Sequence, residues 1–344
     1  MGQVQADKVL HWLLRSIAAN QGNGSAAFAH LWKGWAPPYP ETTGYIIETL
    51  FDYRKEEEAF ACADWLCTLQ KSDGSFPGGL GTQGPPVVFD TGMILTGLVT
   101  AYRNRQDQNY HKGIEATVKW LLSQLSADGV WQSHSYLAGY APSYHSRIVW
   151  AILEANQILQ SLELSIKMKK ALDHSLSLAL PNHAVQNWGF VPGQPAFTHT
   201  IAYTLRGWLE AGRLLQTPQA IEQATHTAKK LLQIRIKMGR LGGTYDEAWQ
   251  GDDQFICVTG HAQLSIVFGR LFQITKDSSF LQGAKLLFKD IANSPGILPI
   301  DRLHGAIPGS LPWWGGYQPW RFPNWAAKFY LDAAKLLTDL STGE

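Results

Sequence analysis

Histidine side chains recur where apolar segments of this sequence begin. His145, His199 and His261 stand in "YHSR", "FTHTIAY" and "VTGHAQ", at the starts of three such segments. An imidazole takes up or releases a proton near neutral pH, which acid/base catalysis requires. We therefore predict that His199 and His261 face one pocket and move a proton on and off a substrate carbon, with His145 and Tyr203 beside them.

Carboxylates offer a second set of catalytic candidates. Glu41 and Asp90 stand in "PETTGY" and "FDTGM", at the starts of two more apolar segments, and Asp246 and Asp253 stand in "YDEAWQGDDQF". Two carboxyl groups about 5–9.5 Å apart are the usual machinery of glycoside hydrolysis. A hydrolase using such a pair therefore stays open beside the histidine mechanism.

The substrate-binding candidates are cationic, amide and aromatic side chains. Arg147 and Lys328 are placed to clamp a carboxylate, and Trp-rich, Gly/Pro-rich loops are typical of surfaces that stack on sugar rings. The complete set comprises Arg147, Asp90, Gln263, Trp131, Trp188, Trp249, Trp313, Trp314, Tyr317, Trp320, Arg321, Asn324 and Lys328. Some of the polar residues at the segment starts are also favoured helix N-caps, namely Thr42, Asp90, Thr198, Thr259 and Asn324.

Twelve helical segments must position these residues. Amphipathic segments are expected at 8–21, 56–71, 110–126, 166–180, 218–237 and 278–293. They alternate with segments that are apolar nearly all round, at 43–54, 90–103, 145–159, 198–215, 259–275 and 324–338. Six repeats of this pair predict an all-α (α/α)6 toroid, with an outer and an inner ring, in one domain over residues 1–344.

Connection lengths predict where the site lies. The connections from outer to inner helices are long, whereas most of those from inner to outer helices are very short. Parallel inner helices would then place their N-termini and every long loop on one face. Long loops carry function more often than short ones, so we expect the site on that face.

Composition excludes several other classes of function. Lys and Arg number 29 against 28 Asp and Glu, so no net field attracts nucleic acid or an anionic membrane. No signal peptide, membrane span or disulfide framework is expected, which favours a cytoplasmic protein. Neither a metal nor another cofactor is expected, because Cys257 and His261 alone make a weak ligand set and glycine-rich phosphate loops are missing.

Several motifs resemble known families. "DGSF" and "DGVW" resemble the turns of squalene-cyclase and prenyltransferase repeats. The series "YPETTGYIIET", "FDTGMILTGL", "FTHTIAYTLRGWLEAG", "VTGHAQLSIV" and "HGAIPGS…GGY…FPNWAAKFYLDA" is similar to bacterial proteins of exopolysaccharide gene clusters, from about residue 30 to 338. The resemblance implies a toroid related to glucuronyl C5-epimerases, N-acylglucosamine 2-epimerases, unsaturated glucuronyl hydrolases and polysaccharide lyases, and a glycan substrate.

These observations favour an enzyme of epimerase or lyase type that acts on an acidic, uronate-type sugar. A glycoside hydrolase is the first alternative. A terpene cyclase is another, although Asp252 and Asp253 lack the first aspartate of the DxDD motif that the resemblance would require. A glycan-binding module without catalysis is the alternative from a different class, and the oligomeric state is left open.

Overall fold

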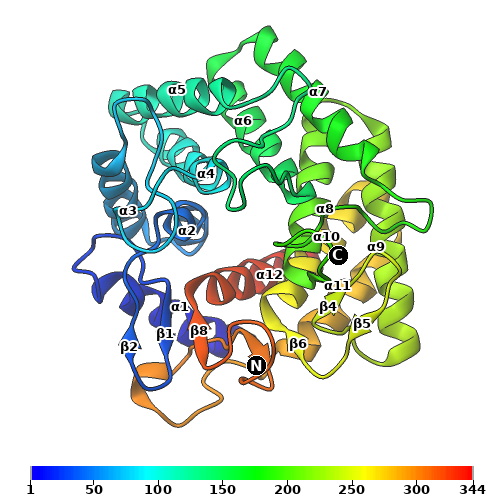
Figure 1. Cartoon of the computed structure of the whole chain (residues 1–344). Coiled ribbons are helices and arrows are strands. Elements are labelled where there is room, and N and C mark those ends of the chain that lie inside the picture. The colour runs from blue at the N-terminus through cyan, green and yellow to red at the C-terminus, as the bar shows by residue number, and fades with distance from the viewer. Residues whose placement is uncertain (1, 343–344) are drawn as a thin grey trace.

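Two concentric rings of α-helices make up the computed structural model, which describes residues 2–342 (Figure 1). The outer helices are α1 (Gly2–Ala18), α3 (Glu56–Leu69), α5 (Gln108–Ser123), α7 (Leu162–Ser177), α9 (Pro218–Met238) and α11 (Ser278–Ile291). The inner helices are α2 (Pro40–Asp52), α4 (Val88–Asn104), α6 (Ser146–Leu159), α8 (Thr198–Leu214), α10 (Val258–Thr275) and α12 (Asn324–Thr342). The predicted (α/α)6 toroid is confirmed.

The inner ring closes on itself. Each inner helix packs against the next, from α2 through α4, α6, α8 and α10 to α12, and α12 packs against α2. Amphipathic and nearly apolar segments alternate in the sequence because an outer helix buries only one face, whereas an inner helix is covered on most sides. One hydrophobic core accordingly runs between the two rings, with Trp12 of α1 and Trp208 of α8 among its fully buried members.

Glycine allows neighbouring inner helices to approach closely. A Cβ atom added to Gly97 of α4 would lie 2.3 Å from the carbonyl oxygen of Gly44 in α2. At Gly260 of α10, an added Cβ would lie 2.7 Å from the backbone nitrogen of His199 in α8. Glycine at these positions therefore permits close helix packing, which offsets its helix-propensity cost of about 1 kcal/mol per residue.

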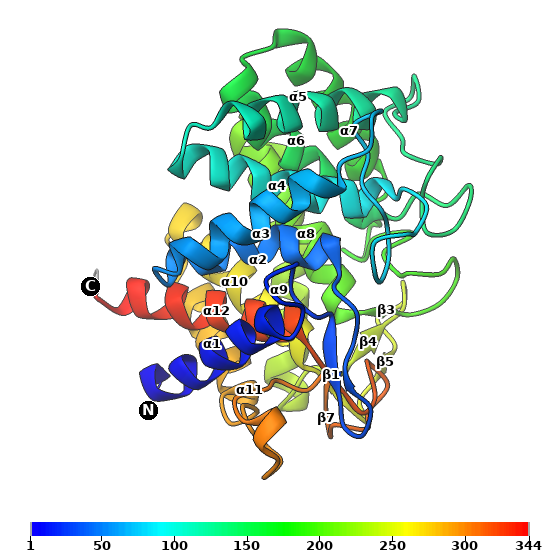
Figure 2. The same cartoon turned by 90° about the vertical axis from the view of Figure 1, so that its left-hand side faces the viewer.

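All the long connections lie at the N-terminal ends of the inner helices, as predicted. They comprise residues 19–39, 70–87, 124–145, 178–197, 239–257 and 292–323. Figure 2 shows the strands of these connections on one side of the rings and both chain ends on the opposite side. A 3₁₀ turn at Ser143–His145 leads into α6, and another lies at Asp301–Leu303.

Short strands tie these connections together. A sheet of order β2-β1-β8 joins β1 (Phe28–His30) to β2 (Gly34–Trp35) and β8 (Arg321–Pro323). A second, of order β3-β4-β5, comprises Ala196–Phe197, Thr244–Tyr245 and Gly251–Asp252, and a third pairs β6 (Ile256–Cys257) with β7 (Ser310–Leu311). The antiparallel pair β1–β8 links the first long connection to the last.

The predicted N-caps are wrong for all five residues. Thr42, Asp90, Thr198, Thr259 and Asn324 lie inside their helices, which begin at or before them. The residues that cap the first four of these helices make no side-chain cap hydrogen bond. Strand and loop backbone leads directly into the inner helices instead. Within residues 2–342, no helix has the length and apolar content needed to cross a membrane.

Candidate active site

A cavity of about 390 Å³ lies where the inner helices begin, and we call it the central pocket. Four inner helices each supply their second residue to it: Glu41 of α2, Phe89 of α4, His199 of α8 and Trp325 of α12. Four residues make slightly more than one helical turn, so a residue four positions further on faces the same way. Tyr45 and Tyr203 accordingly line the central pocket below Glu41 and His199.

The remaining lining comes from four different long connections. These residues are Tyr39, Tyr136, Leu137, Phe190, Val191, Tyr317 and Gln318. The Tyr317 hydroxyl accepts a hydrogen bond of 2.9 Å from the Trp325 indole nitrogen, which fixes both rings in the wall. Glu41 is the only carboxylate, and no lysine or arginine lies among the described residues that line this pocket.

Two buried carboxyl groups are joined by two tyrosine hydroxyls, and we call the four residues the carboxyl relay. Tyr136 donates a short hydrogen bond to Oδ1 of Asp90, whose Oδ2 accepts from the backbone N–H of Gly79 at 2.8 Å. The hydroxyl oxygens of Tyr136 and Tyr39 lie 2.6 Å apart, and the Tyr39 hydroxyl is a hydrogen-bonding neighbour of Glu41.

Both acids of the carboxyl relay have raised pKa values. Burial, reinforced by the negative charge of Asp90, holds the pKa of Glu41 well above its ordinary value. Burial raises the pKa of Asp90 to about 6, against the opposing effect of the hydrogen bonds from Tyr136 and Gly79. Burial therefore favours the neutral form of both acids, and at Glu41 the charge of Asp90 adds to this effect.

The direction of the hydrogen bonds is set at the Asp90 end of the carboxyl relay. Tyr136 gives its only hydroxyl proton to Asp90, so its oxygen accepts the proton of Tyr39. The side-chain hydrogen bonds that reach Glu41 lower its pKa, which opposes the larger effect of burial. The carboxyl relay thus connects Glu41, which lines the central pocket, to Asp90 behind it.

His199 presents a hydrogen-bond donor to the central pocket. The side-chain nitrogen of Gln263 lies 2.6 Å from Nδ1 of His199, and an amide nitrogen only donates. Burial, with a smaller effect of the Arg147 charge, lowers the pKa of His199 to about 3, so the ring is neutral. A neutral ring that accepts at Nδ1 carries its hydrogen on Nε2, which suits it to bind a substrate oxygen and not to act as a base.

The prediction that His261 also faces the central pocket is wrong. It is the fourth residue of α10, two positions later than His199 in α8, and two residues rotate a side chain by about 200°. His261 is fully buried, with Nδ1 3.2 Å from the Cys257 carbonyl oxygen and Nε2 3.7 Å from Oδ2 of Asp290 in α11. It packs between the two rings, where burial lowers its pKa to about 4.

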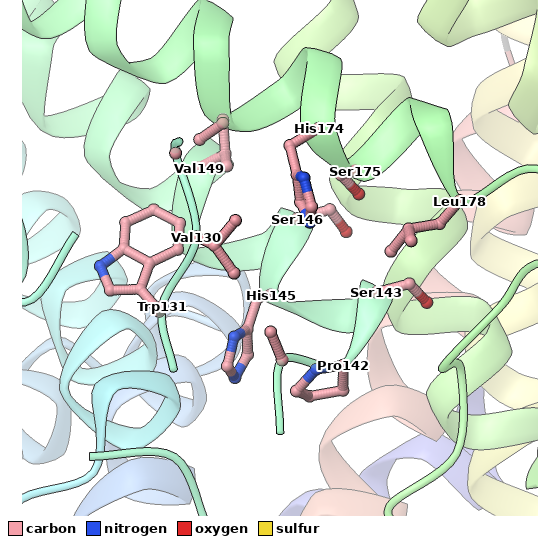
Figure 3. A pocket seen from close by; sticks show the side chains of 13 residues that line it. Val130, Trp131, Pro142, Ser143, His145, Ser146, Val149, His174, Ser175 and Leu178 are labelled. Atoms are coloured by element: carbon pink, nitrogen blue, oxygen red, sulfur yellow. The ribbon is translucent and has the colours of Figure 1, made fainter. Parts of the chain in front are cut away.

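His145 does not line the central pocket either. It lies with Trp131 at a separate cavity of only about 20 Å³ between α6 and α7. Figure 3 shows the Trp131 and His145 rings on one side of this cavity, whereas His174 and Ser175 project from α7 on the opposite side. Burial lowers the pKa of His145 to about 3, and the space suits one water molecule better than a sugar.

The expected carboxylate clamp lies deeper in the ring. Arg147 stacks on Tyr203, with 4.6 Å from Cζ to the ring centroid, and does not line the central pocket. Lys328 pairs with Asp332 and, at 3.6 Å, with Glu48. Gln263 reaches the central pocket only through its hydrogen bond to His199.

Of the two candidate carboxylates of the acidic loop, Asp253 is exposed and Asp246 is half-buried. Oδ1 of Asp246 accepts hydrogen bonds from the backbone N–H groups of Ala248 and Gln250, at 2.9 and 2.7 Å. Asp253 accepts one from the side chain of Gln254 at 3.3 Å. Neither lines the central pocket, so the prediction that they lie in the active site is not met.

Three of the candidate tryptophans pack inside the protein. Trp131 is buried and donates to the Leu121 carbonyl at 2.8 Å. Trp188 and Trp249 are in edge contact, with 5.3 Å between their ring centroids, and Trp249 donates to the Asn182 carbonyl. These three rings shape the walls of the connections and do not reach the central pocket.

The other tryptophans form an aromatic cluster outside the central pocket. Trp313 contacts Trp314 and Trp320 at centroid distances of 4.9 and 4.8 Å, and Trp320 contacts Trp32 at 5.2 Å. Trp32 and Trp314 are 68% and 55% exposed. We call these four residues the Trp cluster, and it offers exposed rings on the loop-bearing face.

Two further candidates hold the first and last segments of the ring together. The Asn324 amide donates to Ser25 and Thr42 hydroxyls at 2.9 Å each and is fully buried. The Arg321 guanidinium lies 4.8 Å above the Phe28 ring across the β1–β8 pair. Of the predicted site residues, the structure therefore brings Glu41, His199, Tyr203 and Tyr317 together around the central pocket, with Asp90 behind Tyr136.

Several lining residues were not predicted from the sequence. Tyr45 and Trp325 could have been found from helical spacing, because they share the pocket-facing positions of Glu41 and His199 in their helices. Tyr39, Tyr136 and Phe190 lie in the connections, where sequence periodicity carries no information about direction.

Comparisons with known proteins establish the fold. No protein-family model and no curated protein sequence matches this chain. Among solved structures, an unsaturated glucuronyl hydrolase specific for heparin is similar at TM-score 0.76 and 16% identity, over 99% of this chain and 98% of its own. The unsaturated glucuronyl hydrolase of Bacillus sp. GL1 is similar at TM-score 0.77 and 14% identity, over 100% of this chain and 97% of its own. Cellobiose 2-epimerase from Bacillus thermoamylovorans is similar at TM-score 0.72 and 12% identity, over 97% of this chain and 98% of its own.

Proposed function

We propose that this protein is a carbohydrate-active enzyme of hydrolytic type, with Glu41 as its catalytic acid. The observation that carries the proposal is the carboxyl relay: a buried carboxyl group with a raised pKa lines the central pocket and is connected through two tyrosine hydroxyls to a second buried carboxyl group. Similarity in fold to glucuronyl hydrolases, an epimerase and a mannose isomerase supports a sugar as substrate. The exopolysaccharide setting remains a prediction from the sequence.

Glu41 would act first as an acid and then as a base. Its proton passes to the oxygen of the bond that breaks, or to the carbon of an unsaturated sugar, and the resulting carboxylate then takes a proton from the attacking water. Asp90 is fully buried and reaches the central pocket only through Tyr136, so we assign it a positioning role. Burial and, after it, the negative charge of Asp90 raise the pKa of Glu41 and so favour the protonated form that an acid needs.

His199 would orient the substrate. Its Nε2–H group, fixed by Gln263, can donate to a sugar oxygen, while the rings of Tyr203 and Tyr317 pack around it at centroid distances of 4.4 and 5.4 Å. The two-histidine epimerase predicted from the sequence lacks its second histidine at this pocket. A carboxyl-based hydrolase therefore accounts for the geometry better than the epimerase or lyase.

The lining also bears on the sugar. A uronate carboxylate needs a cation, and the described lining of the central pocket contains no lysine or arginine. An uncharged sugar ring, stacked on tyrosine and tryptophan faces with its hydroxyls on His199 and Gln318, fits these residues better. The test described below also includes acidic sugars as substrates.

A terpene cyclase is the second candidate, because the same pocket is largely aromatic. Tyrosine, phenylalanine and tryptophan rings make up most of its wall, and such rings stabilise carbocations through their π faces. A neutral carboxylic acid beside them could protonate an alkene. Substrate class separates the two candidates, since the proton donor is common to both.

The test compares substrates and variants in one assay. The full chain is incubated in H₂¹⁸O with neutral oligosaccharides, saturated and unsaturated uronate oligosaccharides, and isoprenoids, and products are identified by mass spectrometry. We expect ¹⁸O in a sugar product, a loss of about 10²–10⁴-fold in kcat for Glu41→Gln, and full activity for the control Asp246→Asn in the acidic loop. Asp90→Asn should move the basic limb of the pH profile to lower pH.

Other outcomes would reject the proposal. Full activity of Glu41→Gln would remove the acid, and cyclised isoprenoids without any sugar product would favour the terpene cyclase. Solvent deuterium at a sugar carbon without hydrolysis would restore the epimerase.

A further inference from the structure

A second cavity lies on the axis of the ring, deeper than the central pocket, and we call it the axial cavity. It has a volume of about 50 Å³ and is lined by the charged and polar residues Glu48, Arg147, Arg206, Gln263, Lys328 and Asp332. Glu48, Arg206 and Asp332 are each the ninth residue of their inner helix, two turns beyond the residues at the rim of the central pocket. The axial cavity shares no lining residue with the central pocket.

Arg147 is the unusual member of this lining. Its side chain is only 3% exposed, and the rings of Tyr203, Trp150 and Phe329 surround the guanidinium at 4.6, 5.3 and 5.9 Å. No side chain or carbonyl of residues 2–342 accepts a hydrogen bond from it, and its Nε atom is buried without a partner. A buried cation without a hydrogen-bonded counter-charge is costly, which points to a missing anion.

The neighbouring carboxylates are already engaged. Lys328 pairs with Asp332, which also accepts a hydrogen bond of 2.7 Å from the Thr49 hydroxyl. The Glu48 carboxylate lies 3.6 Å from the ammonium group of the same Lys328. Arg206 pairs at 3.0 Å with Glu210. The lining of the axial cavity thus contains three cations and two carboxylates, which leaves an excess of one positive charge.

Glu210 does not supply the missing charge to Arg147. It is 2% exposed, and Arg270 and Arg213 also bind it, at 2.8 and 3.2 Å. The positive charge of Arg206, with the hydrogen bonds from these two arginines, overcomes the effect of burial and lowers the pKa of Glu210 to about 2. Its single charge is shared among Arg206 and two arginines outside the axial cavity.

We propose that the axial cavity binds one small monovalent anion of chloride size, held by Arg147 together with Lys328 and Arg206. The excess charge sets the valence, and the volume sets the size. One water-sized particle needs at least about 10–15 Å³ of such space, which the axial cavity exceeds, whereas pockets for sugars and drug-sized ligands start at about 300 Å³. Side chains of Glu48 and Arg206, 31% and 21% exposed, form the outer edge through which the ion enters.

A charge in the axial cavity affects the pKa values of residues that line the central pocket. The charge of Arg147 lowers the pKa of Glu41 and of His199, so an anion beside Arg147 would offset that effect at both residues. Anion binding itself does not depend on the proposed enzymatic function, and its test uses no substrate.

The test measures thermal stability against anion type. The full chain is dialysed into a halide-free buffer at constant ionic strength, set with sodium gluconate, and gluconate is replaced stepwise by chloride or bromide. A ligand that binds only the folded state raises Tm in a saturable way. We expect this rise with chloride and bromide, and one anomalous bromide peak in soaked crystals within hydrogen-bond reach of Arg147.

Two matched variants on α12 locate the site. Lys328→Met should weaken bromide binding by about tenfold or more, because it removes a charged hydrogen-bond donor. Lys335→Met removes a lysine of the same helix that pairs with Asp339 outside the axial cavity, and should bind bromide as the parent does. If Lys328→Met does not fold, Arg206→Gln with the bromide soak replaces it. Equal Tm in chloride and gluconate, equal losses in both lysine variants, or bromide only elsewhere would each overturn the proposal.

Discussion

The hydroxyl oxygens of Tyr39 and Tyr136 lie 2.6 Å apart, although 97 positions separate these residues in the chain. Tyr39 immediately precedes α2, and Tyr136 belongs to the connection before α6. Their contact connects Glu41 at the start of α2 with Asp90 at the start of α4, which neither inner helix could achieve alone.

Removing the Tyr136 hydroxyl should change the titration of Asp90. In Tyr136→Phe, Asp90 loses a hydrogen bond that favours its ionised form, so its pKa should rise above about 6. Glu41 should then hold its proton less tightly, because the charge that raises its pKa is partly neutralised. Carboxyl ¹³C NMR titration of labelled protein measures both values. Tyr140→Phe, in the same connection but hydrogen-bonded to the Gly189 carbonyl, is the control and should leave them unchanged.

Substitution of the histidines should separate binding from stability. His199→Phe keeps a ring but removes the donor of the central pocket, so sugar affinity should fall while Tm changes little. His261→Gln should lose about 1–3 kcal/mol of stability, because the buried Cys257 carbonyl loses its partner Nδ1, which lies 3.2 Å away. Calorimetric melting and ligand titration of both variants check this. A loss of affinity in His261→Gln with unchanged melting would contradict the placement.

Tryptophan substitutions should divide in the same way. Trp314 is 55% exposed, so Trp314→Ala should leave the free energy of unfolding nearly unchanged and weaken any ligand that reaches the Trp cluster. Trp131 is 2% exposed, and Trp131→Ala should cost about 3–5 kcal/mol. Denaturant unfolding and Trp-quenching titrations measure the two effects. Equal destabilisation by both variants would argue against the packing described above.

Acid should destabilise the fold through its buried histidines. Burial lowers the pKa of His145 and His199 to about 3 and of His261 to about 4, so each stays neutral in the folded state and protonates first in the unfolded one. Their contribution is complete above the unfolded value of about 6.5 and is lost as pH falls below it, by up to about 1.4 kcal/mol per unit and histidine.

Carboxyl groups with raised pKa values act in the opposite direction. Glu41 and Asp90 bind protons more tightly in the folded state, so their contribution is present at low pH and is lost as pH rises through about 6 for Asp90 and higher for Glu41. Glu41→Gln should therefore melt at a higher temperature than the parent at pH 8. Calorimetry from pH 4 to 9 tests both slopes, and a single transition would support the predicted single domain. Stability that does not change between pH 6.5 and 4.5 would contradict the histidine assignment.

The sequence predicts the helices well and the directions of side chains less well. Segment 259–275 is found as Val258–Thr275, because a helix covered on most sides has few polar residues and clear loop boundaries. His199 and His261 look equivalent in "THT" and "TGH", yet Gly260 packs against α8 and rotates His261 away. Such a rotation depends on contact between two helices, which periodicity along one helix does not encode.

The carboxyl relay could be predicted only in part for a similar reason. Glu41 and Asp90 stood out as acids at helix starts, whereas Tyr39 and Tyr136 lie in connections whose course depends on the whole ring. The tryptophans misled in the other direction, since indole rings such as Trp131 and Trp188 fill walls as readily as they bind sugars. Composition cannot distinguish these two uses, because both place an indole beside a glycine-rich turn.

Pairing of β1 with β8 has a consequence for synthesis on the ribosome. Strand β1 precedes the first inner helix and β8 precedes the last, and the wall of the central pocket needs Glu41 from one and Trp325 from the other. A nascent chain that ends before residue 325 can form helical hairpins but has an open ring and exposed apolar inner helices. Activity should therefore appear only after the final helix has left the exit tunnel, and incomplete chains should be substrates for chaperones and proteases.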